Sequence, residues 1–148
     1  MNFTPSLEII LVEDNMNDAE LTIRALKKNK IVNNIVHLKD GKDAIDYLFS
    51  QGAYADKELK LNASLILLDL KMPGMSGIEV LTKIKSNEHT KLLPVVVLTS
   101  SKESPDIEEC YRLGVNSYIV KPVEIENFSK AVTQIGIYWL LLNQPPVA

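Results

Sequence analysis

Four apolar segments of this chain are each followed or ended by side chains that can take part in chemistry. In chain order, these side chains are Glu13, Asp14, Asp69, Thr99 and Lys121. If the four segments are parallel strands, their carboxyl ends meet at one edge of a sheet, where ligands of such sheets bind. The sequence therefore predicts one site that gathers three carboxylates, a hydroxyl and an ammonium.

The three carboxylates are typical of a site for a hard metal ion. Acids that lie close together raise one another's pKa unless a cation lies between them. Mg²⁺ prefers oxygen ligands and commonly links carboxylates to phosphoryl oxygens. We therefore expect Glu13, Asp14 and Asp69 to bind Mg²⁺, with the backbone carbonyl of Lys71 as a further ligand.

Asp69 ends its apolar segment and is the expected nucleophile. Its carboxylate could attack an activated phosphoryl group and form an aspartyl phosphate. Mg²⁺ and Lys121 would neutralise the charge that develops, and the Thr99 hydroxyl would donate a hydrogen bond to a phosphoryl oxygen. Taken alone, each of these residues is better interpreted as a solvated loop side chain. Taken together, on four separate segments, they are better interpreted as one site.

The elements that must position these residues follow from the apolar pattern. Short apolar runs, read as strands, alternate with segments of helical periodicity. The expected strands are 8–13, 34–38, 64–69, 93–99 and 117–120, and the expected helices are 18–29, 41–51, about 76–87, about 104–114, and from 124 onward.

Helix starts are indicated by capping patterns. Asn17 stands three residues before Glu20, and Ser76 stands three residues before Glu79, as in N-terminal capping pairs. The first helix should therefore begin after Asn17, and its apolar positions Leu21, Ala25 and Leu26 recur at helical spacing.

Apolar strands that alternate with helices predict a parallel sheet covered by helices on both faces, a doubly wound α/β fold. The 148 residues are enough for a single domain, with a core of about 7–142 and a flexible tail at 143–148. A hydrophobic fraction of 46% and a net charge of -3 exclude a disordered chain and give no reason to expect nucleic acid. We expect no membrane partner and a cytoplasmic location, which the single cysteine, Cys110, fits.

The chain resembles the receiver domain of bacterial response regulators over nearly its whole length. The resemblance rests on VEDN with Glu13 and Asp14, LLDLKMPGMSG with Asp69, VVVLTSS with Thr99, and YIVKP with Lys121. It implies a flavodoxin-like fold with strand order 2-1-3-4-5. It also implies a two-component switch in which a sensor histidine kinase passes a phosphoryl group to Asp69 in the presence of Mg²⁺. Such a domain catalyses its own phosphotransfer and dephosphorylation and is not an enzyme.

The resemblance assigns further roles. It implies a cis peptide bond between Lys121 and Pro122, and a switch in which Thr99 moves toward the phosphoryl group while Tyr118 rotates inward. Tyr118 could instead be a plain half-buried aromatic residue of a strand. Lys71 departs from the uncharged residues that are commoner at this position, and its ammonium could hold the phosphoryl group or crowd Lys121.

A narrower resemblance points to the single-domain regulators that partner bacterial phytochromes and hybrid histidine kinases. It rests on the long polar segment 52–63 and on the IYWLLL sequence at 137–142. Four apolar residues there lie off the stripe that would dock the last helix on the sheet: Ile137, Tyr138, Leu140 and Leu141. They predict an interface with a partner or in a homodimer, whose affinity phosphorylation would change, although a local wrap onto the chain's own surface would also cover them.

Three other classes of protein share parts of this pattern. A haloacid-dehalogenase-like phosphatase would carry a second aspartate where this chain has Lys71. A flavodoxin-like flavin protein would need a hydroxyl-rich loop after the first strand, but EDNMND is acidic and would repel phosphate. A pseudo-receiver, an interaction module without phosphorylation, is the remaining alternative, and the intact set of acidic, hydroxyl and amine side chains argues against it.

Overall fold

The computed structural model describes residues 7–28, 32–55, 65–100 and 105–134. The four residues of the expected interface (Ile137, Tyr138, Leu140 and Leu141) and the expected tail at 143–148 lie outside this part of the chain.

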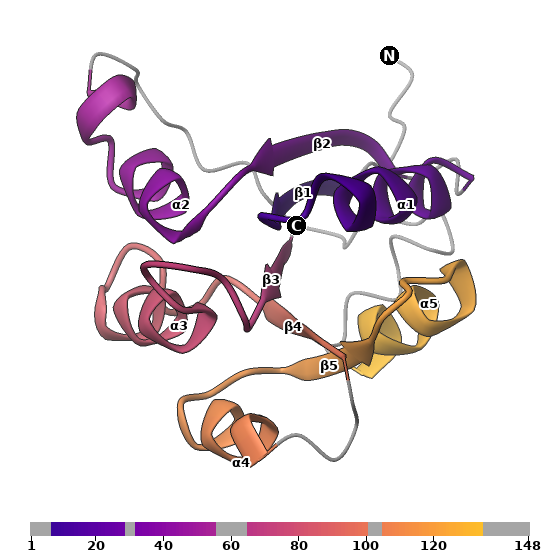
Figure 1. Cartoon of the computed structure of the whole chain (residues 1–148). Helices are drawn as coiled ribbons and strands as arrows, with labels where there is room; N and C mark the ends of the chain where they lie inside the picture. The colour runs from indigo at the N-terminus through magenta and orange to yellow at the C-terminus, as the bar shows by residue number, and fades with distance from the viewer. Residues whose placement is uncertain (1–6, 29–31, 56–64, 101–104, 135–148) are drawn as a thin grey trace, which may run out of the picture.

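Strands and helices alternate along the described residues, as the apolar pattern predicts (Figure 1). The strands are β1 (Leu7–Val12), β2 (Val32–Leu38), β3 (Leu65–Asp69), β4 (Val95–Thr99) and β5 (Ser117–Val120). The helices are α1 (Met16–Lys27), α2 (Gly41–Leu48), the short 3-10 helix η1 (Gly52–Tyr54), α3 (Gly77–Ser86), α4 (Pro105–Arg112) and α5 (Ile125–Gln134).

All strand pairs in the sheet are parallel, and the strand order is β2-β1-β3-β4-β5, so the expected topology is confirmed. The connection after β1 leads to β2 on one side, whereas β3 pairs with β1 on the other side. The order therefore reverses between β1 and β3. In open parallel sheets, the carboxyl ends of the strands at such a reversal form the ligand site.

Helices cover both faces of the sheet: α1 and α5 lie on one face, and α2, α3 and α4 lie on the other (Figure 1). Every residue of β3 and β4 is buried. Because successive side chains of a strand point to opposite faces, Leu65 and Leu67 of β3 pack toward α1 and α5, and Ile66 and Leu68 pack toward the other three helices. The central strands are therefore held on both sides.

The start of α1 differs from the prediction. The N-cap is Asn15, whose side-chain oxygen accepts a hydrogen bond of 3.0 Å from the Asp18 N–H, so Asn17 lies inside the helix. Of the apolar positions expected along this helix, Leu26 is fully buried and Ala25 is partly buried, but Leu21 is 52% exposed and does not belong to the core face. Pattern alone could not decide between two asparagines two residues apart. The backbone N–H of Asn15 donates a hydrogen bond to the buried Glu13 carboxylate, and this contact favours Asn15 as the N-cap.

The other helix ends agree more closely with the sequence. The Ser76 hydroxyl accepts a hydrogen bond from the Glu79 N–H and so caps α3, as predicted. In α5, Phe128 and Val132 are fully buried against the sheet.

Of the described helices, none is long and apolar enough to cross a lipid bilayer.

Candidate functional site

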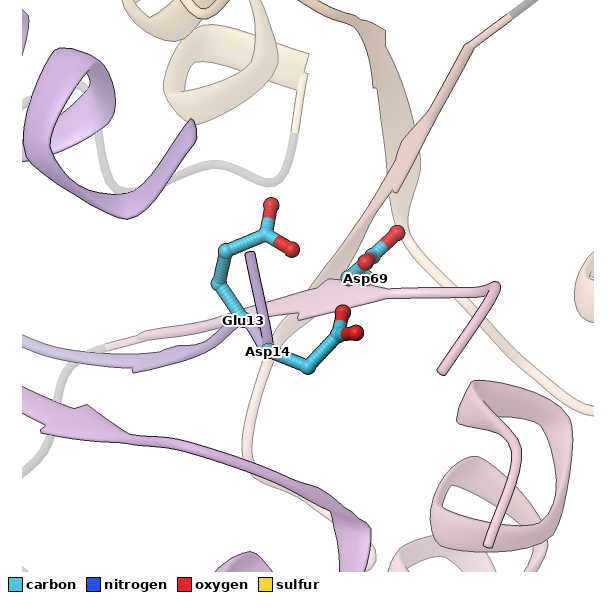
Figure 2. A group of neighbouring side chains, drawn as sticks. All are labelled: Glu13, Asp14 and Asp69. Carbon is cyan, nitrogen blue, oxygen red and sulfur yellow. The ribbon is translucent and has the colours of Figure 1, made fainter. Parts of the chain in front are cut away.

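Three carboxylates meet at the carboxyl ends of β1 and β3 (Figure 2). Glu13 and Asp14 follow β1, and Asp69 is the last residue of β3. Each residue offers one carboxylate oxygen, and these oxygens lie within 4.8 Å of one another. Glu13 and Asp69 are buried, with 0% and 4% of their surface exposed, whereas Asp14 is partly exposed. The structure therefore brings together the three acids that the sequence predicts as metal ligands.

The backbone of Glu13 is held by β2. Its N–H donates a hydrogen bond of 3.1 Å to the Leu38 carbonyl, and its own carbonyl lies 2.8 Å from the His37 Nε2. A carbonyl can only accept a hydrogen bond, so this contact requires the proton to be on Nε2. His37 was not among the predicted site residues, because nothing in the sequence indicates that its ring reaches the end of β1.

Lys121 extends into the acidic cluster from the end of β5. Its Nζ lies 2.7 Å from Glu13 Oε1, 3.1 Å from Asp18 Oδ2 and 3.4 Å from Asp69 Oδ1. The peptide bond between Lys121 and Pro122 is cis. The ammonium thus faces two of the three clustered acids, together with Asp18, which the sequence pattern indicates only as the start of a helix.

The environment of Glu13 Oε1 tests whether a cation fits this site. Although Lys121 Nζ is only 2.7 Å away, this contact lacks hydrogen-bond geometry, and Oε1 is a buried atom without a hydrogen-bond partner among the described residues. An unsatisfied, buried carboxylate oxygen costs free energy. A small divalent ion between Glu13, Asp14 and Asp69 would supply the missing partner, so the residues fit a metal ion.

The pKa values of Asp69 and Lys121 are shifted by burial and by the charged groups close to them. Burial is the main cause that raises the pKa of Asp69 to about 7, and the adjacent Glu13 carboxylate adds to it, while Lys121 and the Lys71 N–H act in the opposite direction. Burial lowers the pKa of Lys121, but the facing carboxylates of Glu13, Asp69 and Asp18 more than offset this and hold it above its ordinary value. Without a metal ion, Asp69 is therefore partly protonated at neutral pH.

This raised pKa predicts that the metal-free protein loses stability as the pH rises. The unfolded Asp69 carboxyl has a pKa of 3.8 and the folded one a pKa of about 7, so the unfolded state releases this proton first. Between pH 5 and pH 8, this carboxyl should reduce the free energy of unfolding by roughly 2–3 kcal/mol. Urea unfolding in EDTA would measure this loss in the unmodified protein, and Asp69→Asn should lack it.

The exposed Glu108 of α4 provides the control for this prediction. Glu108→Gln should keep the full pH dependence of the unmodified protein. Parallel stability curves for the unmodified protein and Asp69→Asn between pH 5 and pH 8 would contradict the assigned environment of Asp69.

Thr99 and Tyr118, the two predicted switch residues, lie in different places. Thr99 ends β4, is buried, and lines the same cavity as Asp69. Tyr118 lies on β5, half-buried, and packs edge-to-face on Tyr111 of α4, with ring centroids 6.5 Å apart. The structure therefore places Thr99 in the site and Tyr118 against α4, outside the lining of the cavity.

The cavity above the acidic cluster has a volume of about 210 Å³, which is room for several water-sized groups. Most of the residues that line it are polar, and they come from the strand ends and the first turn of α1: Asp14, Asn15, Asp18, Asp69, Leu70, Lys71, Leu98, Thr99, Ser100 and Lys121. The Lys71 N–H lies 3.4 Å from Asp69 Oδ1. A cavity with acids, two amines and two hydroxyls can bind a hydrated cation together with a small anion.

Comparison with known proteins agrees with this arrangement. The family model described as response regulator receiver domain matches residues 9–133. A probable methanogenesis regulatory protein, FilR2 of Methanothrix harundinacea, is 40% identical over 93% of this chain and 86% of its own. The response regulator Rcp1 of Synechocystis is 39% identical over 97% of this chain and 96% of its own.

Solved structures that resemble this chain are also response regulators. The bacteriophytochrome response regulator AtBRR is 45% identical, with a TM-score of 0.83 over 95% of this chain and 100% of its own. The phosphorylated cyanobacterial phytochrome response regulator RcpA is 38% identical, with a TM-score of 0.74 over 96% and 99% of the two chains. The Mn²⁺-bound form of Rcp1 is 35% identical, with a TM-score of 0.72 over 97% and 99%.

Proposed function

The chain belongs to the response regulator receiver family of two-component signal transduction, and we propose that Asp69 is its phosphoacceptor in a Mg²⁺-dependent reaction. The observation that carries this proposal is the convergence of Glu13, Asp14, Asp69 and Lys121 at one cavity. A pseudo-receiver has no need of a buried carboxylate cluster with a facing ammonium, and so this alternative is not favoured.

The carboxylates of Glu13, Asp14 and Asp69 and the carbonyl of Lys71 would hold the metal ion. When bound, a Mg²⁺ ion would neutralise negative charge on the phosphoryl oxygens and on the crowded carboxylates. The unsatisfied Glu13 Oε1 supports a cation at this place, and the existence of a Mn²⁺-bound form of Rcp1 is consistent with a divalent one. Because Asp69 must be ionised to act as a nucleophile, a cation would also favour its reactive form.

In the proposed reaction, a carboxylate oxygen of Asp69 attacks the phosphorus of the donor. The bond between phosphorus and the donor nitrogen of a kinase phosphohistidine breaks as the aspartyl phosphate forms. The Lys121 ammonium would pair with one phosphoryl oxygen, and the Thr99 hydroxyl would donate a hydrogen bond to another. Attack of water on phosphorus would later release phosphate and restore Asp69. The domain would therefore act as a switch and not as an enzyme that turns over an external substrate.

Acetyl phosphate offers a direct test of this proposal. With Mg²⁺, the unmodified protein should gain one phosphoryl group in an intact-mass measurement, while acetate leaves. Asp69→Asn should gain none, and EDTA should abolish the gain in the unmodified protein. A protein whose mass does not change under these conditions would be a pseudo-receiver.

Lys71 is expected to prolong the phosphorylated state. Its exposed side chain borders the cavity two residues beyond Asp69, where an ammonium would attract the phosphoryl oxygens. Exposed charge pairs contribute up to about 1 kcal/mol, so Lys71→Asn should speed phosphate release up to about fivefold, with less effect on Mg²⁺ affinity. A phosphate-release assay measures the rate, and equal rates for the two proteins would contradict this role.

The partner we propose is a sensor histidine kinase, of phytochrome-like or hybrid type. The bacteriophytochrome and cyanobacterial phytochrome response regulators among its relatives support this choice. We further propose that phosphorylation changes the affinity for a partner or a second copy of the chain. The cytoplasmic location, the lack of a nucleic-acid partner and the extent of the single domain stay predictions from the sequence.

A further inference from the structure

Lys121 has a carboxylate partner outside the acidic cluster. Its Nζ donates a hydrogen bond of 3.1 Å to Asp18 Oδ2, which joins β5 to the first turn of α1. The contact with Asp18 has hydrogen-bond geometry, whereas the shorter contact with Glu13 Oε1 does not. Asp18 therefore holds the ammonium from outside the group of acids that converge on one point.

Local structure holds Asp18 in place for this contact. Its backbone N–H donates to the side-chain oxygen of Asn15, the N-cap of α1, which fixes the first turn of the helix. The side chain of Asp18 is 40% exposed and borders the cavity together with Asp69 and Lys121. An acid in the first turn is favoured by the helix dipole wherever it points, so the dipole alone does not account for its pairing with a lysine from β5.

Asp18 differs from the other two acids that face Lys121. Glu13 and Asp69 belong to the cluster whose oxygens converge on one point, and Asp18 does not. A cation in that cluster would compensate the negative charges of Glu13 and Asp69. The attraction between these two carboxylates and the Lys121 ammonium would then be weaker. Among the described residues, Asp18 would then be the carboxylate left to hold Lys121.

We propose that Asp18 is a positioning residue that keeps the Lys121 ammonium in place while the cluster binds its cation. This inference rests on the proposed phosphorylation of Asp69. The hydrogen bond to Asp18 uses one of the three ammonium protons and limits the directions of the other two. The ammonium would then have a proton available for the phosphoryl group in the cavity that Lys121 lines. Without Asp18, the lysine side chain would have to be ordered during the reaction itself.

Phosphorylation by acetyl phosphate, followed by intact mass over time at saturating Mg²⁺, tests this role. Asp18→Ala removes the hydrogen bond to the Lys121 ammonium. We expect this variant to be phosphorylated about fivefold more slowly than the unmodified protein. Asp18→Asn keeps an oxygen acceptor and should stay within about twofold of the unmodified rate. Mg²⁺ affinity, measured by calorimetry, should be the same within about twofold in Asp18→Ala, because Asp18 lies outside the cluster.

A double-mutant cycle with Lys121→Ala separates positioning from other effects. If Asp18 acts through the ammonium, Asp18→Ala should not slow phosphorylation further in the Lys121→Ala protein. The proposal is overturned if Asp18→Ala is not slower than the unmodified protein, if Asp18→Asn is as slow as Asp18→Ala, or if the slowing persists without Lys121. Absence of phosphorylation in the unmodified protein would instead refute the function on which the inference rests.

Discussion

Lys121→Ala should slow phosphorylation of Asp69 by acetyl phosphate roughly 100-fold or more, the usual effect of removing a donor that stabilises charge in a transition state. The reason is that the ammonium lies 3.4 Å from Asp69 Oδ1, where the phosphoryl oxygens would carry their charge. The rate would be followed by intact mass at saturating Mg²⁺.

The same substitution should also destabilise the metal-free protein. It leaves Glu13 and Asp69 buried without their facing cation, and breaking a buried pair in this way costs about 3 kcal/mol. Urea unfolding in EDTA measures this cost, and Mg²⁺ should recover part of it, because the cation replaces the lost positive charge. The combined result would distinguish a lysine of the site from a surface lysine.

Lys42 provides the matched control. It forms an ion pair of 2.8 Å with Asp46 on α2, but its side chain is 79% exposed. Lys42→Ala should leave both the free energy of unfolding and the phosphorylation rate essentially unchanged, because an exposed ion pair contributes little. Equal phosphorylation rates for Lys121→Ala and Lys42→Ala would contradict the role assigned to Lys121.

Gly77→Ala should destabilise the protein by about 3 kcal/mol, the upper end of the range for overpacking. A Cβ atom at Gly77 would overlap the Asp69 carbonyl oxygen and lie 2.6 Å from the Leu70 Cα. Both are backbone atoms at the end of β3, and the Gly77 N–H already donates to the Leu70 carbonyl. The strand end could move away only by displacing Asp69, so Mg²⁺ affinity should fall with stability.

The sign of this effect makes the prediction specific. Gly77 has no left-handed backbone, and helix propensity alone would make alanine stabilising at the first residue of α3. Gly74 is the reverse case: it has a φ of 77°, but nothing lies within 4 Å of an added Cβ. Gly74→Ala should cost only about 1 kcal/mol, from backbone strain. A neutral or stabilising Gly77→Ala in urea unfolding would contradict the close approach of α3 to β3.

The local pattern of residues determined most of the fold and the acidic cluster. β3 and β4 are apolar on both faces because both faces are buried, and so their parallel pairing is readable from the sequence. In a parallel sheet, the strand ends lie at one edge. Side chains that end these strands, such as Asp69 and Thr99, could therefore be assigned to one site from residue order alone.

Tertiary structure alone decided the contacts made across the sheet. Asp18 and Lys121 are 103 residues apart, and no periodicity relates them. Their hydrogen bond depends on where α1 begins, and the cap at Asn15 sets that point together with the buried Glu13 carboxylate. Strand and helix patterns report which face of an element is buried. The partner of a single polar atom depends on how separate elements pack, since a shift of one helical residue turns a side chain by about 100°.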